Sequence, residues 1–362
     1  MNTKIRVGIV GIHPERGWAG MAHVPALQSL PQFEITAISN SDPEQARVAA
    51  AKFGVANALT STDDLLANAD VDLVVVTVRV PHHLDVITKA IEAGKAVFSE
   101  WPLGANLNDA VTMAELASSR NVRTAIGLQT RFAPAINYVR DLVRQGWVGD
   151  VMSNSLIVSG INWGEAMNKN FAYTLDSSSG AGMLHVPVAH TLDVVSYLFD
   201  SPVADLDGTF AIRRATSRLI ETGEDLPMRT PDQIAVSGSL QNGVFVNAHF
   251  RGGLSQASNF RWEINGAKGD LVIENHLGYV GLGGFRLLGA QGHEELNDLP
   301  VPASYERAAV GLGLGQNVAL LYAQLASDIQ NNTRLAPDFD DAVGLHQLIA
   351  GIEGSEMPRR PG

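Results

Sequence analysis

The first residues with a chemical pattern are glycines that follow a short apolar run at 5–10. Gly11, Gly17 and Gly20 come between that run and the start of an expected helix. A glycine loop between a strand and a helix leaves backbone N–H groups free to bind a pyrophosphate. His13 stands where the usual GxGxxG pattern has its second glycine, so this loop is longer than the standard one. The loop predicts a dinucleotide site, and a turn used only for packing is the alternative.

The end of the second predicted strand determines which dinucleotide such a loop selects. An acidic residue there binds the ribose 2′-hydroxyl and selects NAD, whereas this chain has Ser39 and Asn40. Small neutral side chains leave room for a 2′-phosphate, and Arg16 or Arg79 is placed to reach it. The sequence therefore favours NADP over NAD, and use of both stays open.

Alternating strands and helices must position these residues in the first part of the chain. The expected strands are 5–10, 33–39, 71–78, 96–100 and 122–128. The expected helices are 20–30, 43–53, 81–93 and 106–120. Nearly uninterrupted Val and Ile runs indicate strands buried on both faces, which is typical of a parallel sheet covered by helices on each side. This part is predicted to be doubly wound.

A different pattern follows an expected helix at about 133–145. Alternation of apolar and polar residues predicts long antiparallel strands at 151–161, 203–215, 233–240, 244–251, 259–265 and 270–274. Further helices are expected at 191–199, 313–331 and 340–352. The predicted domains are therefore a dinucleotide-binding domain at 1–130 and an antiparallel-sheet domain at 131–362, whose C-terminal helices pack back on the first domain.

The composition excludes several classes of function. The 362 residues carry a formal net charge of −12, which disfavours a nucleic-acid or membrane-surface partner. No apolar run approaches the length of a membrane helix. The chain has no cysteine, so thiolate chemistry is excluded and any redox chemistry must come from a cofactor. We expect a cytoplasmic protein with no metal site, because His13, His82 and His83 lack the spacing of metal ligands.

Several segments resemble the glucose-fructose oxidoreductase and inositol dehydrogenase (Gfo/Idh/MocA) family. The segments are AGKAVFSEWPLG at 93–104, GLQTRFAP at 127–134, GAGMLHVPVAHTLD at 180–193 and PDFDDAVGLHQLI at 337–349. The resemblance implies an N-terminal Rossmann domain and a C-terminal domain built on a large open, mostly antiparallel sheet. It also implies an NAD(P) cofactor, a sugar or polyol substrate, and a homodimer or homotetramer that uses the open sheet.

The site residues expected from the loop and from this resemblance fall into two groups. The cofactor group is Gly11, Ile12, Gly17, Trp18, Ser39, Asn40, Arg79, His83, Glu100, Trp101 and Gln129. The proton-transfer group is His190, which matches the family's histidine, and Tyr173, whose phenol would replace a missing acid.

Departures from the family pattern lie at the reacting centre. Trp101 occupies the position of the family's catalytic lysine, and an indole cannot take a proton from an alcohol. Val186 and Val188 stand where the family's DxGxH segment has its aspartate and glycine. Pro187 predicts that helical geometry begins after His185, which would keep His185 and His190 from facing one cleft.

Two functions remain open from the sequence. The first is an NAD(P)-dependent oxidoreductase that acts on a sugar, a polyol or a related hydroxyl or carbonyl compound. The second is a dinucleotide-binding regulatory protein without turnover. GWA at 17–19, VRVPHH at 78–83 and EWPL at 100–103 resemble the branch that contains the galactose-pathway repressor of yeasts. The oxidoreductase is favoured, because no basic segment or nuclear signal is present.

Overall fold

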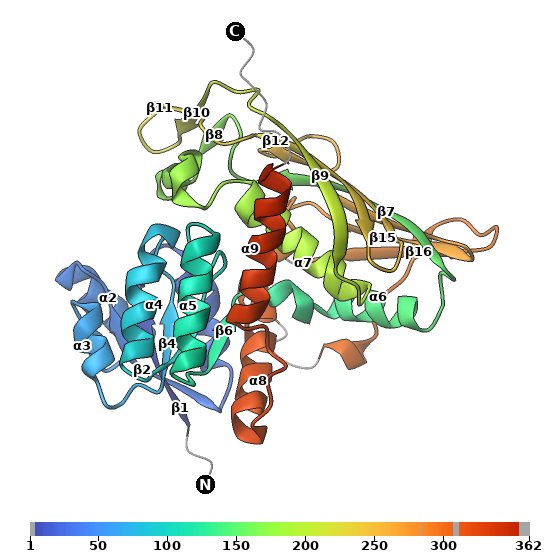
Figure 1. Cartoon of the computed structure of the whole chain (residues 1–362). Coiled ribbons are helices and arrows are strands. Elements are labelled where there is room, and N and C mark those ends of the chain that lie inside the picture. Colours follow the sequence, from blue (N-terminus) through green and yellow to red (C-terminus); the bar gives the residue numbers. More distant parts are fainter. Residues whose placement is uncertain (1–3, 283, 307–310, 355–362) are drawn as a thin grey trace. The chain divides into compact units, whose positions relative to one another are not determined.

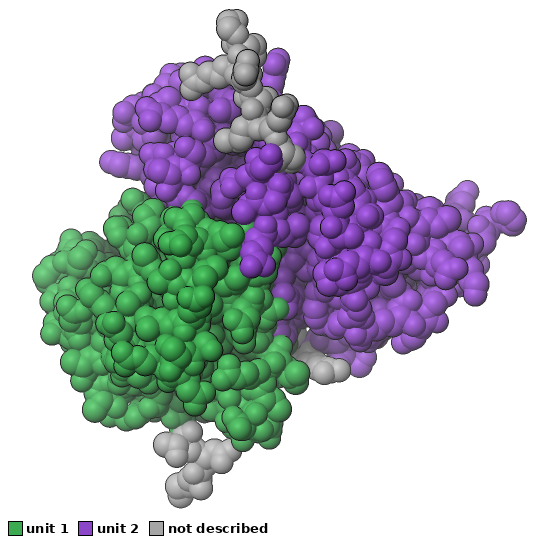
Figure 2. All heavy atoms as spheres, viewed as in Figure 1, with its two compact units in different colours: residues 1–129, 307–346 green, residues 130–306, 347–362 purple. Residues whose placement is uncertain are grey.

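The computed structural model describes residues 4–282, 284–306 and 311–354. The chain forms two compact units, coloured separately in Figure 2. Unit 1 contains residues 1–129 and 307–346, and unit 2 contains residues 130–306 and 347–362. The segment 307–346 returns to the unit formed by the first part of the chain, so unit 1 is discontinuous in sequence.

Unit 1 is built on a parallel six-stranded sheet (Figure 1). The strands are β1 Ile5–Val10, β2 Phe33–Ser39, β3 Asn57–Leu59, β4 Leu73–Val76, β5 Ala96–Ser99 and β6 Thr124–Ile126. Their spatial order is β3-β2-β1-β4-β5-β6, the order of a dinucleotide-binding Rossmann sheet. The predicted doubly wound parallel sheet is therefore confirmed. All four residues of β4 are buried, which explains its uninterrupted run of apolar side chains.

The helices of unit 1 connect these strands. They are α1 Val24–Gln28, α2 Pro43–Phe53, α3 Thr62–Ala67, α4 His83–Glu92, α5 Leu107–Ser119, α8 Gln316–Asn331 and the first half of α9 Phe339–Gly354. Helix α2 begins as predicted, because the Asp42 carboxylate accepts the N–H groups of Glu44 and Gln45. It ends at Gly54, which has a left-handed φ of 70°. The C-terminal helix α8 packs against α1 within this unit.

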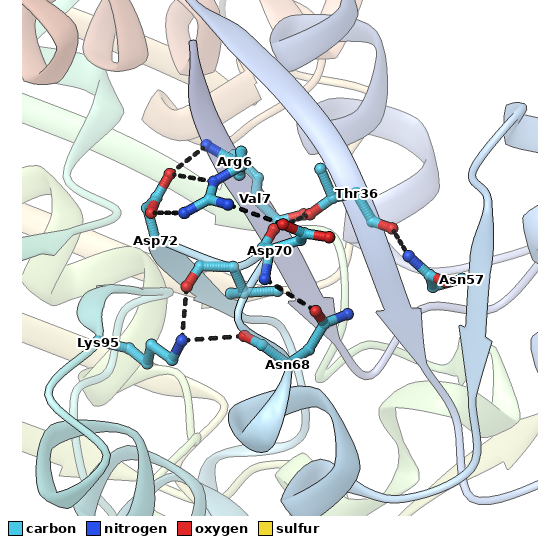
Figure 3. Close-up of polar contacts among 9 residues, drawn as sticks. Arg6, Val7, Thr36, Asn57, Asn68, Asp70, Asp72 and Lys95 are labelled. Carbon is cyan, nitrogen blue, oxygen red and sulfur yellow. Dashed lines mark hydrogen bonds and ion pairs between the residues drawn. The ribbon is translucent and has the colours of Figure 1, made fainter. Parts of the chain in front are cut away.

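Charged side chains tie together the amino ends of the strands (Figure 3). Arg6 on β1 donates from Nε and Nη2 to the two carboxylate oxygens of Asp72, at 2.9 and 2.6 Å, and from Nη1 to Asp70 at 2.8 Å. Lys95 donates from Nζ to the carbonyl oxygen of Val71 at 2.7 Å. Because the strands are parallel, this cluster lies at the edge of the sheet opposite the glycine loop. Its role is to hold β1, β4 and β5 in register.

Unit 2 is built on an eight-stranded, mostly antiparallel sheet. The strands, in the order in which they pair, are β17 Asn297–Asp298, β16 Arg286–Gln291, β15 Gly269–Asn275, β14 Phe260–Gly266, β7 Val151–Gly160, β13 Phe245–Gly252, β12 Gln233–Leu240 and β9 Val203–Ala211. Among the described strands of this sheet, only the β7–β13 pair is parallel. The large, mostly antiparallel sheet is thus confirmed. The turns predicted at Asn242-Gly243 and 265–269 connect β12 to β13 and β14 to β15.

The remaining elements of unit 2 are short. Helix α6 spans Pro134–Arg144 and α7 spans Ala189–Leu198, while β8 Ala166–Met167, β10 Thr216–Leu219 and β11 Asp225–Pro227 form a separate three-stranded sheet. Along β13, Val246, Ala248 and Phe250 are buried while the residues between them face outward. Strand β9 ends at Ala211, so the prediction of a strand to 215 was too long.

The entry to α7 corrects one prediction about Pro187. The π-helical segment η6 runs from Leu184 to Val188 and continues directly into α7, so helical geometry already includes His185. The proline is accommodated because the turn is widened: the N–H of Val188 reaches back to the carbonyl of Met183, five residues earlier. The wider turn relieves the contact between a proline ring and the carbonyl four residues before it.

Candidate functional site

The glycine loop follows the carboxyl end of β1, as a dinucleotide site requires. Gly11 has a left-handed φ of 94°, and its N–H donates to the carbonyl of Ser39 at 3.1 Å. A Cβ added at Gly11 would lie 2.9 Å from the backbone nitrogen of Val78, so a larger residue does not fit there. Gly17, with a φ of 90°, is exposed and has open space around its Cα. The loop therefore closes tightly at its start and is open at its tip.

Asn40 fixes the shape of this loop from the end of β2. Its Nδ2 donates to the carbonyl of Ile12 at 2.6 Å, and its Oδ1 accepts the N–H of Asp42 at 2.9 Å. Asp42 in turn caps α2. The carboxylate of Asp42 is therefore bound at the start of α2, and the amide of Asn40 is bound to the backbone of the glycine loop. Ser39, the last residue of β2, is buried.

Two buried polar atoms near the predicted cofactor site have no hydrogen-bond partner among the described residues. They are Nε1 of Trp18, in the glycine loop, and Oε1 of Gln129, just after β6. Buried polar groups are normally satisfied, so unpaired ones point to a ligand or to water. Together with the cradle at Gly11, these groups fit a dinucleotide, which offers both hydrogen-bond donors and acceptors.

His83 and Arg79 take different positions at the end of β4. The His83 ring is buried and contacts two carbonyl oxygens, Nε2 with Val78 at 3.0 Å and Nδ1 with Leu103 at 3.2 Å. Burial lowers the pKa of His83, so its ring is neutral and donates a hydrogen bond to one of these two carbonyl oxygens. Arg79 is exposed at the start of the turn η2 Val80–His82.

Glu100 belongs to a buried polar chain that the sequence did not predict. Its Oε1 lies 2.9 Å from Nε2 of His23, and Nδ1 of His23 lies 2.7 Å from the hydroxyl of Tyr322. His23 ends the π-helical segment η1 Ala19–His23, directly after the glycine loop, and Tyr322 lies on α8. The imidazole and the phenol are fully buried. Burial, with a smaller contribution from Glu100, raises the pKa of Tyr322 well above its usual value.

Trp101 is packed in the interior of unit 1. Its ring lies 4.6 Å from the ring of His346 on α9, measured between centroids, and the side chain is 5% exposed. The Nε2 atom of His346 accepts the N–H of Gly104 at 3.4 Å. The Trp101 indole therefore packs at a tilted angle against the His346 imidazole.

His190 is a buried titratable residue of α7 in unit 2. Burial lowers its pKa to about 3, so the imidazole is neutral at physiological pH. Its Nδ1 has no partner in the described part of the chain. The ring found against it belongs to Tyr279, with centroids 5.5 Å apart in an edge-to-face arrangement. The loop that carries Tyr279 is held by Asn275, whose Oδ1 accepts the N–H of Gly278 at 2.8 Å.

Tyr173 is the second predicted proton-transfer residue, and His185 is the histidine that precedes His190 at the entry to α7. Tyr173 lies in the 3₁₀ segment η4 Lys169–Leu175 and is partly buried. His185 has its Nε2 3.6 Å from a carboxylate oxygen of Glu353, and burial lowers its pKa to about 4. Within the described ranges, no group of three His, Asp or Glu side chains is arranged to hold a metal ion.

Sequence reasoning missed His23, Tyr279, Tyr322 and His346. The only signal for His346 was its place in the family-like segment at 337–349, and Tyr279 lies in a glycine-rich stretch that reads as sheet and turn. His23 and Tyr322 are 299 positions apart, so neither predicts the other.

None of the helices in the described part of the chain has the length and apolar character needed to cross a membrane.

Comparison with known proteins agrees with this division of the chain. The model of the oxidoreductase family with an NAD-binding Rossmann fold matches residues 5–128. The model of the Gal80p C-terminal domain matches residues 134–275. Each model thus falls on one of the two sheets described above.

Individual relatives include a regulator and an enzyme. The galactose/lactose metabolism regulatory protein GAL80 of Saccharomyces cerevisiae is 28% identical over 98% of this chain and 93% of its own length. Inositol 2-dehydrogenase 3 of Saccharopolyspora erythraea is 28% identical over 68% of each chain. The crystal structure of a super-repressor mutant of Gal80p from Saccharomyces cerevisiae has a TM-score of 0.87 at 26% identity, over 98% of this chain and 96% of that one. The chain therefore belongs to the Gfo/Idh/MocA oxidoreductase family, within its Gal80-like branch.

Proposed function

We propose that this protein is an NAD(P)-dependent oxidoreductase that acts on a hydroxyl- or carbonyl-bearing compound of the sugar or polyol class. The observation that carries the proposal is the glycine loop after β1, where Gly11 adopts a left-handed φ against the backbone of Val78. This is the place and the geometry at which Rossmann domains bind a pyrophosphate. The similarity to an inositol 2-dehydrogenase supports the substrate class.

The bound dinucleotide would supply hydride exchange, and the chain would supply binding and proton transfer. The residues proposed to hold it are those predicted above: Gly11, Ile12, Gly17, Trp18, Ser39, Asn40, Arg79, His83, Glu100, Trp101 and Gln129. His83 and Asn40 would act by fixing loops, since their polar atoms bind backbone groups of those loops. Trp18 and Gln129 would satisfy their buried polar atoms on the ligand.

We favour NADP, because no acidic side chain is available at the end of β2. Asp42 caps α2, and the Asn40 amide is bound within the loop. Arg16 is exposed in the glycine loop and Arg79 is exposed after β4, so both are accessible to a 2′-phosphate.

Proton transfer is assigned to His190, with Tyr173 as the second candidate. A neutral imidazole can accept the proton of a hydroxyl group, which is the role proposed for His190 in oxidation of the substrate. Trp101, at the family's lysine position, has no group that could do this. A base with so low a pKa is weak, and we therefore expect slow turnover.

A second candidate function is a dinucleotide-dependent regulatory protein without turnover. The match of residues 134–275 to the Gal80p C-terminal domain favours it. The burial of Trp101 against His346, which places an aromatic ring where the family has its lysine, agrees with it.

One experiment separates the two functions. The purified chain is incubated with NAD⁺ or NADP⁺ and a panel of aldoses, polyols and cyclitols, and reduced nicotinamide is followed by absorbance. The oxidoreductase proposal predicts turnover that is lost in His190→Gln, with cofactor affinity retained. Cofactor binding without turnover on any panel member supports the regulator. Activity that appears only in Trp101→Lys would contradict the oxidoreductase proposal.

A further inference from the structure

Three polar side chains from distant parts of the sequence meet in the interior of unit 1. Tyr322 comes from α8, His23 from the end of η1, and Glu100 from the residue after β5. The contacts are 2.7 Å from the phenol oxygen to Nδ1 and 2.9 Å from Nε2 to the carboxylate. The imidazole and the phenol are fully buried, and burial of polar groups costs free energy unless they are hydrogen-bonded, so each of these contacts matters to the other two groups.

The order of hydrogen-bond donors in this chain follows from Tyr322. Burial raises the pKa of the phenol, so Tyr322 keeps its proton. Nδ1 of His23 is the one partner found for this buried hydroxyl among the described residues, so the hydroxyl donates its hydrogen bond to Nδ1. An imidazole nitrogen that accepts a hydrogen bond carries no proton, so the proton of the neutral ring lies on Nε2. Nε2 then donates to Oε1 of Glu100. The chain therefore runs from the phenol through the imidazole to the carboxylate and leaves the negative charge on Glu100.

The position of the Glu100 carboxylate is fixed by its surroundings. A Cβ at Gly127 would lie 2.6 Å from Oε1, so the carboxylate is packed directly on this glycine. The ring of Phe98 stands 5.5 Å from that of His23 and 4.8 Å from that of Tyr322, between centroids. None of the described residues donates a hydrogen bond to Oε2 of Glu100, and its side chain is 17% exposed. One carboxylate oxygen is thus bound by His23, and the side chain keeps some exposure to solvent.

Among the described residues, no lysine or arginine pairs with Glu100, and His23 is the only basic side chain in contact with it. The next residue is Trp101, whose uncharged indole packs against the ring of His346. The end of β5 therefore carries a net negative charge.

The sheet order indicates which half of a dinucleotide would meet this charge. The glycine loop lies at the switch point between β1 and β4. A dinucleotide bound there spans both sides of the switch point, with its adenosine half toward β2 and its other half toward β4 and β5. Asn40 ends β2, whereas Glu100 follows β5. Glu100 is therefore on the side of the pyridine ring.

We propose that Tyr322 and His23 are positioning residues that hold Glu100 as a fixed anion, and that this anion makes the chain bind oxidised pyridine nucleotide more tightly than reduced. The oxidised ring carries a positive charge and the reduced ring is neutral, so the carboxylate attracts only the former. The proposal rests on the proposed function, because it requires that a pyridine nucleotide binds.

The test compares the dissociation constants of NAD⁺, NADH, NADP⁺ and NADPH by calorimetry on the full chain. We expect the oxidised form of the bound nucleotide to be favoured about tenfold, the scale of one partly exposed charge interaction. In Glu100→Gln this ratio should fall to about one, chiefly through weaker binding of the oxidised form. Trp101→Lys should lower the ratio as well, because an ammonium group opposes the attraction.

A matched control is Glu34→Gln, which removes one exposed carboxylate from β2 near the amino ends of the strands, where Glu34 lies 3.9 Å from Lys4. It should leave the ratio unchanged. Tyr322→Phe should give an intermediate ratio, because His23 loses the contact that fixes its tautomer. The ¹⁵N spectrum of histidine-labelled protein, with His23→Gln for assignment, should show His23 protonated at Nε2. Thermal melting shows whether each variant is folded.

Two results would overturn the inference, and they are distinguishable. If both redox forms bind and Glu100→Gln leaves their ratio unchanged, the inference is wrong while the proposed function stands. If neither form of either nucleotide binds the wild-type chain, the proposed function fails and the inference fails with it. A His23 ring protonated at Nδ1 would contradict the positioning role directly.

Discussion

His190 combines a neutral ring with a position inside an apolar helix. The other seven residues from Pro187 to Val194 are all buried. Asp193 is the one acidic residue among them, and its carboxylate accepts a hydrogen bond from Arg131 at 2.6 Å. Such surroundings disfavour an imidazolium and explain why the pKa of His190 falls to about 3. The imidazole of His190 is therefore held as a neutral ring.

The lowered pKa of His190 also predicts how stability depends on pH. The folded state binds fewer protons at His190 than the unfolded state between its folded pKa of about 3 and its ordinary value of 6.5. The stability contributed by the neutral ring is therefore present above pH 6.5 and lost as the pH falls through this window. In His190→Gln the melting temperature should fall less steeply between pH 6.5 and pH 4 than in the wild type.

His185, whose pKa is lowered to about 4, is retained in this variant, so the slope should be reduced and not abolished. His276→Gln, at an exposed position, serves as the control and should follow the wild-type curve. A His190→Gln curve parallel to that of the wild type would contradict the buried neutral imidazole.

At the scale of elements, apolar runs and caps predicted most of the fold. The uninterrupted apolar run at 71–78 was sufficient to predict β4, and the Asp42-Pro43 pair was sufficient to predict the start of α2. Both signals are local, because burial on two faces and helix capping are determined by residues close together in the sequence. Strand β3 and helix α3 were missed. β3 has three residues at the edge of the sheet, none of them buried, and α3 has six, so neither leaves a periodic apolar pattern.

The candidate site was less predictable than the fold. Gly11 and His190 stand out in the sequence through a glycine loop and a family-like segment. The contacts of Glu100 with His23, and of Trp101 with His346, depend on returning segments of the chain, and no local rule places them. Pro187 misled the sequence reasoning, because a π-helical turn accommodates it inside a helix.

At the scale of the whole molecule, we propose a homodimer or homotetramer. The outward face of the unit 2 sheet carries Phe245 on β13 and Ile157 on β7, which are 50% and 40% exposed. Both lie on one face of the sheet. His249 pairs with Ile157, and Phe245 is four positions before His249 on the same strand, so its side chain points to the same side. Exposed apolar side chains on a flat sheet favour self-association.

Light scattering at micromolar concentration should therefore give a mass of two or four chains. The double variant Phe245→Glu, Ile157→Glu should shift the mass toward a single chain while the melting temperature stays close to that of the wild type. A wild-type monomer at this concentration would exclude the proposed assembly.

The central claim is that the loop after β1 binds a pyridine dinucleotide, and calorimetric titration of Gly11→Ala with NAD⁺ and NADP⁺ tests it most directly. The added methyl group would lie 2.9 Å from the Val78 backbone nitrogen, so the loop must move. Gly54→Ala is the matched control, because Gly54 has a left-handed φ of 70° but no atom within 4 Å of an added Cβ. We predict that the wild type and Gly54→Ala bind one of the two nucleotides, and that Gly11→Ala binds it at least about tenfold more weakly while remaining folded. Equal affinity in all three proteins, or no binding of either nucleotide to the wild type, would contradict the claim.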